Sequence, residues 1–150
     1  MKLIFEYVRH KNWETESYTK ECDSFRIPSY IAEKMDYSDY MTIVLRNNIL
    51  DETFLANYLG TVDLGLAEYV LDKLKDKSID DSDIGSQGWE AYIENDKVMI
   101  TVMFSTEDDE KVYIDRKEVT YAMLKWKKFL ERKFDSPNYQ EIINTEDVYK

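Results

Sequence analysis

Several residue types on which common active sites depend are scarce in this chain of 150 residues. Cys22 is its one cysteine and His10 its one histidine. A single cysteine cannot form an internal disulfide, and two such residues are fewer than the three or four ligands that a zinc site takes. Cys-His nucleophilic catalysis would need the two residues to meet, which their spacing does not indicate. We therefore expect no catalytic residues, no cofactor and no metal, and a cytoplasmic location.

Glycine and proline are also scarce, with four and two residues. No segment is rich in them, so the sequence indicates no interdomain linker, and its length suits a single domain over residues 1–150. Residues from about 138 to 150 have the composition of a polar tail. No apolar run approaches the roughly 18–20 residues that cross a membrane, and Glu6 interrupts the N-terminal apolar stretch too early for a signal peptide. We expect neither a membrane span nor an export signal.

Acidic residues outnumber basic ones, 31 to 20, which gives a formal net charge of −11. This excess argues against general binding to nucleic acid or to an anionic membrane. Hydrophobic residues still make up 43% of the chain, enough for an ordinary core. A charged partner of this protein is therefore expected to be basic.

The clearest local pattern predicts a β-hairpin. Residues 89–94 and 97–104 both alternate between apolar and polar side chains, and Asn95-Asp96 between them suits a two-residue turn. A further short strand at 111–114 would extend the hairpin to a three-stranded meander. Asp115 and Glu118 then match a capping box, and helical spacing continues from Val119 to Phe134.

The first half of the chain predicts two strands followed by helices. Residues 2–9 suit a strand that is covered on both faces, and residues 40–45 suit a second strand. Helices are expected over 52–59 and from about residue 64, with Asp63 as the N-cap of the second. Together the patterns predict an α+β fold with a mostly antiparallel sheet, a C-terminal β-meander and helices packed on the sheet.

Charge is unevenly distributed in the second half. Residues 76–110 contain eleven acids and two bases, whereas residues 111–133 contain eight bases and three acids. Such segments are often no more than solvated faces. The alternative is that the hairpin and its loops present a negative surface to a basic partner, with association accelerated by electrostatic steering. Tyr92 would lie within that surface if its face of the hairpin is exposed, or in the core if a helix covers it.

Residues 112–118 have the sequence Val-Tyr-Ile-Asp-Arg-Lys-Glu, and residues 123–130 have the sequence Met-Leu-Lys-Trp-Lys-Lys-Phe-Leu. Together they resemble the C-terminal part of small acidic bacterial immunity proteins. These are cognate inhibitors of polymorphic or contact-dependent toxins. The resemblance covers about residues 88–134 and identifies no subfamily. It implies one-to-one inhibition of a toxin domain, expected to be a nuclease with a basic cleft, by recognition and without chemistry.

The charge distribution then suggests which residues would contact the basic partner. They belong to the hairpin and its flanking loops: Asp80, Asp81, Asp83, Glu90, Tyr92, Glu94, Asp108, Asp109 and Glu110. An acidic toxin would instead bind the basic side of the last helix, through Lys117, Lys125, Lys128 and Arg132.

Two other functions stay open at this point. A DNA mimic that inhibits a host nucleic-acid enzyme would carry carboxylates spaced like phosphates along one face. A small carboxylate-dependent enzyme would have a concave pocket containing acids with raised pKa values. An exposed sheet edge would also leave a homo-oligomer open.

Overall fold

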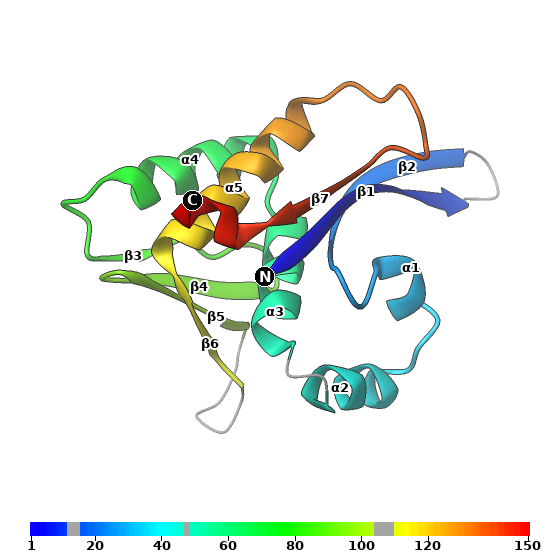
Figure 1. Cartoon of the computed structure of the whole chain (residues 1–150), viewed down its shortest axis with the longest axis horizontal. Helices are drawn as coiled ribbons and strands as arrows, with labels where there is room; N and C mark the ends of the chain where they lie inside the picture. Colours follow the sequence, from blue (N-terminus) through cyan, green and yellow to red (C-terminus); the bar gives the residue numbers. More distant parts are fainter. Residues whose placement is uncertain (12–15, 47–48, 104–109) are drawn as a thin grey trace.

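Two antiparallel sheets and a helix between them form the framework of the fold (Figure 1). The computed structural model describes residues 1–11, 16–46, 49–103 and 110–150. The elements follow one another as β1 (Lys2–Lys11), β2 (Glu16–Ser24), α1 (Ser29–Ala32), α2 (Tyr37–Arg46), α3 (Leu50–Gly60), α4 (Leu64–Lys75), β3 (Asp81–Asp83), β4 (Trp89–Glu94), β5 (Lys97–Val102), β6 (Val112–Asp115), α5 (Arg116–Glu131), β7 (Gln140–Asn144) and the 3₁₀ helix η1 (Thr145–Tyr149). One sheet has the strand order β2-β1-β7 and the other β3-β4-β5-β6. The predicted α+β class with a β-meander is confirmed, although the strands form two sheets.

Helix α3 is the centre of the core. It contacts β1 and β2 of one sheet and β5 and β6 of the other. Its buried side chains point in nearly every direction around the axis: Thr53, Phe54, Leu55, Ala56, Tyr58 and Leu59. A helix that is buried all round has no single apolar stripe, and this is what a position between two sheets requires.

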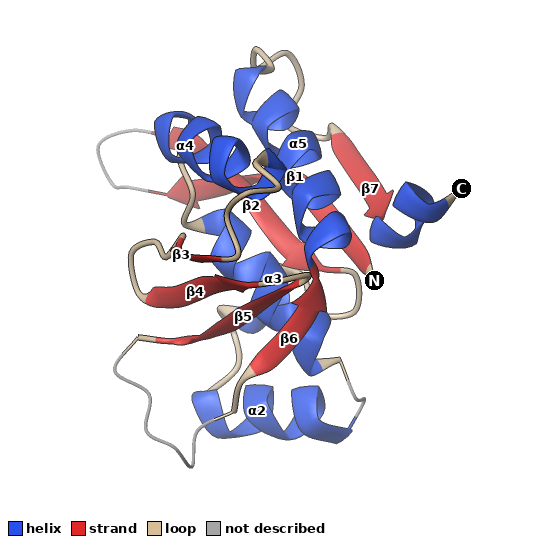
Figure 2. Ribbon diagram, turned by 90° about the vertical axis from the view of Figure 1, so that its left-hand side faces the viewer, coloured by secondary structure: helices blue, strands red, loops and turns tan. Residues whose placement is uncertain are grey.

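Strand β1 occupies the middle of its sheet, as the apolar residues on both of its faces predicted. Phe5 packs against Trp126 and Phe129 of α5, with ring centroids 5.1 and 5.6 Å apart. Helices α4 and α5 lie side by side over this core (Figure 2). The predicted packing of Trp126 and Phe129 onto a sheet is thus confirmed, and the sheet in question is the one that contains β1.

The strand predicted at 40–45 is wrong, because these residues belong to helix α2. β-branched residues make this short segment resemble a strand, but Val44 is buried in a small satellite core with Ile27 and Ile49. Strand β2, which was not predicted, takes the place beside β1 and pairs with it from Leu3↔Ser24 to Lys11↔Glu16. Short apolar runs are ambiguous in this way, and tertiary contacts decide between helix and strand.

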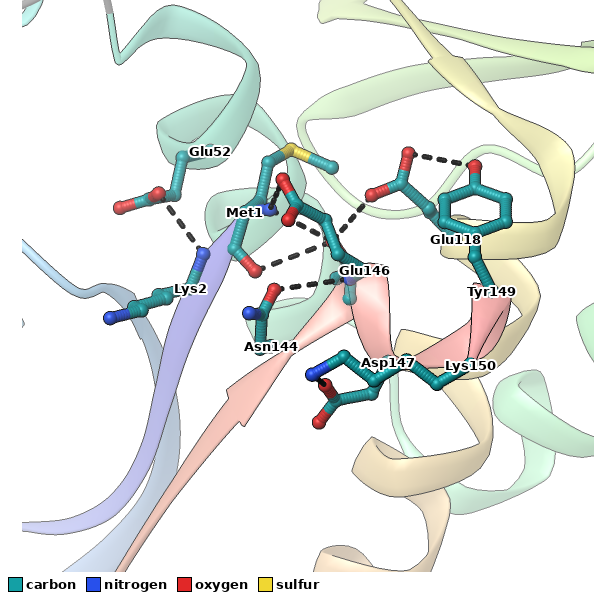
Figure 3. Close-up of polar contacts among 10 residues, drawn as sticks. Met1, Lys2, Glu52, Glu118, Asn144, Glu146, Asp147, Tyr149 and Lys150 are labelled. Carbon is teal, nitrogen blue, oxygen red and sulfur yellow. Dashed lines mark hydrogen bonds and ion pairs between the residues drawn. The ribbon is translucent and has the colours of Figure 1, made fainter.

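The expected polar tail is also wrong in part. Residues 140–144 form β7, which pairs with β1, and η1 follows it. The helix α5 residue Glu118 accepts hydrogen bonds from Thr145 Oγ1 at 2.7 Å and from Tyr149 Oη at 3.2 Å (Figure 3). Glu118 therefore fixes the C-terminal segment and does not close the predicted capping box. Asp115 is the N-cap, as predicted, but it accepts from the Lys117 amide and not from the Glu118 amide that a capping box uses.

No helix within the described ranges is long and apolar enough to cross a membrane.

Candidate functional site

The predicted hairpin is present and has the expected turn. Strands β4 and β5 pair from Trp89↔Val102 to Glu94↔Lys97. Asn95 has a φ of 57°, which asparagine tolerates better than most residues because its side chain can hydrogen-bond locally. β6 pairs with β5 and completes the meander, while β3 adds a fourth strand on the other side. The inward face of this sheet packs against the core through Ala91, Ile93, Val98, Ile100, Val112 and Ile114.

The opposite, outward face collects acidic side chains around Tyr92. Directly paired residues of an antiparallel sheet share a face, and the register pairs Asp83 with Tyr92 and Asp81 with Glu94. Glu90 lies two residues before Tyr92 and so shares its face. We call Asp81, Asp83, Glu90, Tyr92 and Glu94 the acidic sheet face. The register thus brings together five of the nine residues proposed from the sequence.

Tyr92 is half-buried on this face and is part of neither the core nor the loops. Its phenol experiences the surrounding negative charge. The Asp83 carboxylate raises the pKa of Tyr92 above its usual value, with smaller contributions from desolvation and from Glu90. The hydroxyl therefore stays protonated at neutral pH and is a hydrogen-bond donor in a field that favours cations.

Apolar and aromatic side chains extend the same face toward β6. Tyr92 pairs with Met99, which in turn pairs with Tyr113, and Tyr113 is 54% exposed. The sequence analysis missed Met99 and Tyr113. Their place follows from the register of the meander, because directly paired residues of an antiparallel sheet share a face. Met99 itself is only 7% exposed, so the surface combines carboxylates with the rings of Tyr92 and Tyr113 on either side of a buried methionine.

The remaining proposed residues lie elsewhere or outside the described part of the chain. Asp80 is exposed on the loop before β3 and lines a groove of about 700 Å³ that also contains Lys75, Lys77 and Lys117. The groove also contains Asp96 and Asp115, so its charge is mixed, and the register does not place Asp80 on the acidic sheet face. Glu110 is exposed, and its carbonyl oxygen accepts from Thr101 Oγ1 beside that face. Asp108 and Asp109 lie outside the described residues.

Arg116 fixes the loop and the turn that border the acidic sheet face. Its guanidinium donates hydrogen bonds of 2.7–3.1 Å to five backbone carbonyl oxygens, those of Lys73, Leu74, Asp76, Ile79 and Asn95. These belong to the end of α4, the loop before β3 and the hairpin turn. The planar fork of arginine supplies five donors in fixed directions, which suits such a cluster. The sequence gives no signal for this role, since Arg116 looks like any charged residue in a helical first turn.

On the basic side of α5, Arg132 and the neighbouring Lys127 have partners within the chain, whereas Lys117 and Lys128 are exposed. Arg132 donates to Asp135 and to the Tyr7 hydroxyl, and Lys127 pairs with Glu68 and Glu131. These side chains would lose their present partners if they bound an acidic protein.

His10 and Cys22 are not brought together as a catalytic pair would be. The ladder places His10 opposite Ser17 and Cys22 opposite Phe5. His10 Nε2 lies 2.7 Å from Thr19 Oγ1, and burial raises the pKa of the Cys22 thiol. Among the residues that the structure describes, no three or more His, Cys, Asp and Glu side chains are grouped so that they could hold a metal ion.

Comparison with known proteins identifies several relatives, one of which matches nearly the whole chain. UPF0275 protein PM0489 of Pasteurella multocida (strain Pm70) is 28% identical and covers 99% of both chains. UPF0275 protein PM0505 of the same strain is 31% identical over 69% of this chain and 84% of its own length. A third, UPF0275 protein PM0493, is 36% identical over 53% of this chain and 66% of its own length.

No solved structure matches this chain. The family described as "Family of unknown function (DUF5376)" matches residues 1–149. Because that match spans nearly every residue of both sheets and of the helices between them, the chain belongs to this family.

Proposed function

We propose that this protein binds a basic protein partner through the acidic sheet face and inhibits that partner by occupying its surface. The observation that carries the proposal is the convergence of Asp81, Asp83, Glu90 and Glu94 around Tyr92 on the outward face of the four-stranded sheet. The function is recognition, and the protein carries out no reaction.

The chemistry of this face suits association with a cationic surface. The four carboxylates of the face outnumber Lys97, which the register places opposite Glu94, and this negative excess raises the association rate with a basic partner by electrostatic steering. Tyr92 and Tyr113 supply apolar area beside the charges, and tyrosine is favoured at the centres of protein interfaces. A partner that covers Tyr92 and Tyr113 would gain from both electrostatic attraction and the burial of apolar area.

The proposed partner is a bacterial toxin domain, for which this chain would be the immunity protein. This rests on the resemblance of residues 88–134 to immunity proteins and on the acidic net charge of −11. A nuclease domain is the expected target because its substrate cleft must be basic to hold phosphates. At least four family members in one bacterial strain are in keeping with proteins that each neutralise a different partner.

The test pairs the purified chain with the product of the adjoining reading frame. Affinity is measured by calorimetry at low and high salt, and protection is measured as growth when the two are expressed together. The variant Asp81→Lys/Glu94→Lys reverses one opposed pair of the acidic sheet face. We expect it to weaken binding at least tenfold, about 1.4 kcal/mol, to flatten the salt dependence and to abolish protection.

The matched control makes the same change of charge on α4, in Glu68→Lys/Asp72→Lys. Both residues are exposed. If net charge alone governs association, the two double variants will weaken binding equally. Equal loss, or unchanged affinity and salt dependence in Asp81→Lys/Glu94→Lys, contradicts the proposal.

A further inference from the structure

A second acidic site lies away from the acidic sheet face, between β2, α1, α2 and α3. It is a pocket of about 130 Å³. Its lining residues come from the end of β2, the three helices and the β2–α1 connection: Asp23, Ser24, Ile27, Ser29, Ala32, Glu33, Tyr40, Thr53 and Asn57. In Figure 1 this region is on the right, whereas β3 to β6 are on the left. The pocket is therefore independent of the surface on which the proposed function rests.

Two buried side chains in this pocket have oxygen atoms without a hydrogen-bond partner. Asp23 is 5% exposed and Thr53 is 3% exposed. Neither Asp23 Oδ2 nor Thr53 Oγ1 finds a partner among the residues that the structure describes. A buried polar atom left unpaired costs on the order of 1–3 kcal/mol, so native structures rarely keep one without a reason. Both residues lie in the lining of the pocket, and these oxygens can accept a hydrogen bond from a group that enters it.

The charge around the pocket determines what kind of donor would fit. Its lining includes the carboxyls of Asp23 and Glu33 and contains no lysine, arginine or histidine. Glu6 of β1 lies beside Asp23 and adds a third carboxyl. Burial first, and then a hydrogen bond with Glu6 and its charge, raise the pKa of Asp23 from 3.8 to about 8, while hydrogen bonds with Ser29 act in the opposite direction. A cationic donor could replace the proton on Asp23 and balance the carboxylate that results, whereas a neutral donor would leave Asp23 protonated.

We propose that the pocket binds a cationic hydrogen-bond donor, a guanidinium or ammonium group, with Asp23 as its counterion and Thr53 as a second acceptor. The volume supports a group of this size, because pockets for whole small-molecule substrates are about 300–1,000 Å³. A planar guanidinium can donate to a carboxylate and to a neighbouring hydroxyl together. The group can come from a free small molecule or from the side chain of a protein.

The first experiment titrates the full-length protein with methylguanidinium at constant ionic strength and follows backbone amide shifts by NMR. We expect saturable shifts at Ser29, Thr53 and Asn57, and none with N-methylurea, which has a similar shape without the charge. Asp23→Asn should weaken binding at least tenfold. This variant should fold, because asparagine resembles the protonated carboxyl that the pocket now holds.

The matched control is Asp36→Asn, which removes an exposed carboxylate between α1 and α2 while keeping an oxygen that can accept from the Asp39 amide. It should leave the affinity unchanged. Equal binding of N-methylurea, equal affinity in Asp23→Asn, or identical shifts with sodium chloride alone would each overturn the proposal.

A second titration distinguishes the two sources of the cation. N-acetyl-arginine N-methylamide carries the same guanidinium on a peptide-like backbone. If it binds as well as methylguanidinium, the pocket admits the side chain of a protein. If only methylguanidinium binds, the pocket serves a free small molecule, and both results support a cation site.

Discussion

Arg116 illustrates how a single side chain can organise a surface that it does not belong to. The five carbonyl oxygens that it contacts come from segments 22 residues apart in the sequence, between Lys73 and Asn95. Without the guanidinium these carbonyls would converge without a donor, at the point where α4 leads into β3. The position of β3, and with it of Asp81 and Asp83, depends on this cluster.

Replacing Arg116 by lysine should destabilise the protein although the charge is kept. An ammonium has three donors on a flexible stem and cannot satisfy five carbonyls in the fixed directions of a guanidinium. We expect the free energy of unfolding in urea to fall by about 2–3 kcal/mol. Lys128→Met, an exposed site on the same helix, should change it by less than about 0.5 kcal/mol. An unchanged free energy of unfolding in Arg116→Lys would mean that Arg116 acts only through its charge.

Asp23 should give the protein an unusual pH dependence. Its pKa in the folded state is raised to about 8, so the fold favours the protonated carboxyl. The stabilisation is complete below the unfolded pKa near 3.8 and is lost as the pH rises through about 8. The other titratable groups at the pocket are Glu6 from β1, Glu33 from α1 and Tyr40 from α2, while the α3 side chains there are uncharged.

The measurement compares the wild type with Asp23→Asn by urea unfolding at pH values from 4 to 9, without added cation. The wild type should lose stability relative to the variant across this range and level off above about pH 8. Subtracting the two curves removes the titration of the other carboxylates. A difference that stays constant with pH would show that Asp23 is ionised throughout.

At the scale of elements, sequence reasoning succeeded where the pattern is local. The β4–β5 hairpin follows from alternation and a turn at Asn95, and α5 follows from helical spacing after Asp115. β7 could not be found in this way, because Gln140–Asn144 becomes a strand only through pairing with β1 at the other end of the chain. The acidic sheet face lies between these cases. The sequence predicted that the β4 residues of this surface share a face of the hairpin. It also named Asp81 and Asp83 as candidates, but only the register of the three-residue strand β3 places them on that face.

The C-terminal element should detach when its anchor on α5 is removed. Glu118 accepts from the buried Thr145 hydroxyl, and Thr145 Oγ1 also accepts from the N-terminal amine of Met1 at 3.0 Å (Figure 3). Glu118→Ala should lower the free energy of unfolding by about 1–2 kcal/mol and speed amide exchange in Thr145–Tyr149. The exposed Glu131→Ala on the same helix should leave exchange there unchanged. Faster exchange throughout the molecule in Glu118→Ala would contradict a local role.

At the scale of the whole molecule, the two sheets are joined through one core rather than stacked as separate units. Leu3 and Phe5 of the first sheet belong to the same buried cluster as Ile93 and Ile100 of the second. Helix α3 links them, and the Tyr58 hydroxyl on it donates a hydrogen bond to the Ile84 carbonyl before β4. Burial is the main reason that the pKa of Tyr58 is raised, which keeps this donor protonated. Both sheets should therefore unfold together.

Shortening Leu55, a fully buried residue of α3, tests this cooperativity. Leu55→Ala leaves a cavity between the sheets and should lower the free energy of unfolding by about 2–5 kcal/mol. The slowest-exchanging amides of β1 and of β5 should accelerate by the same factor, because each can exchange only when the shared core opens. The partly exposed Leu64→Ala on α4 removes the same atoms at the surface and should cost less than about 1 kcal/mol. If β5 accelerates while β1 does not, the sheets open independently, and the acidic sheet face could be remodelled without disturbing the Asp23 pocket.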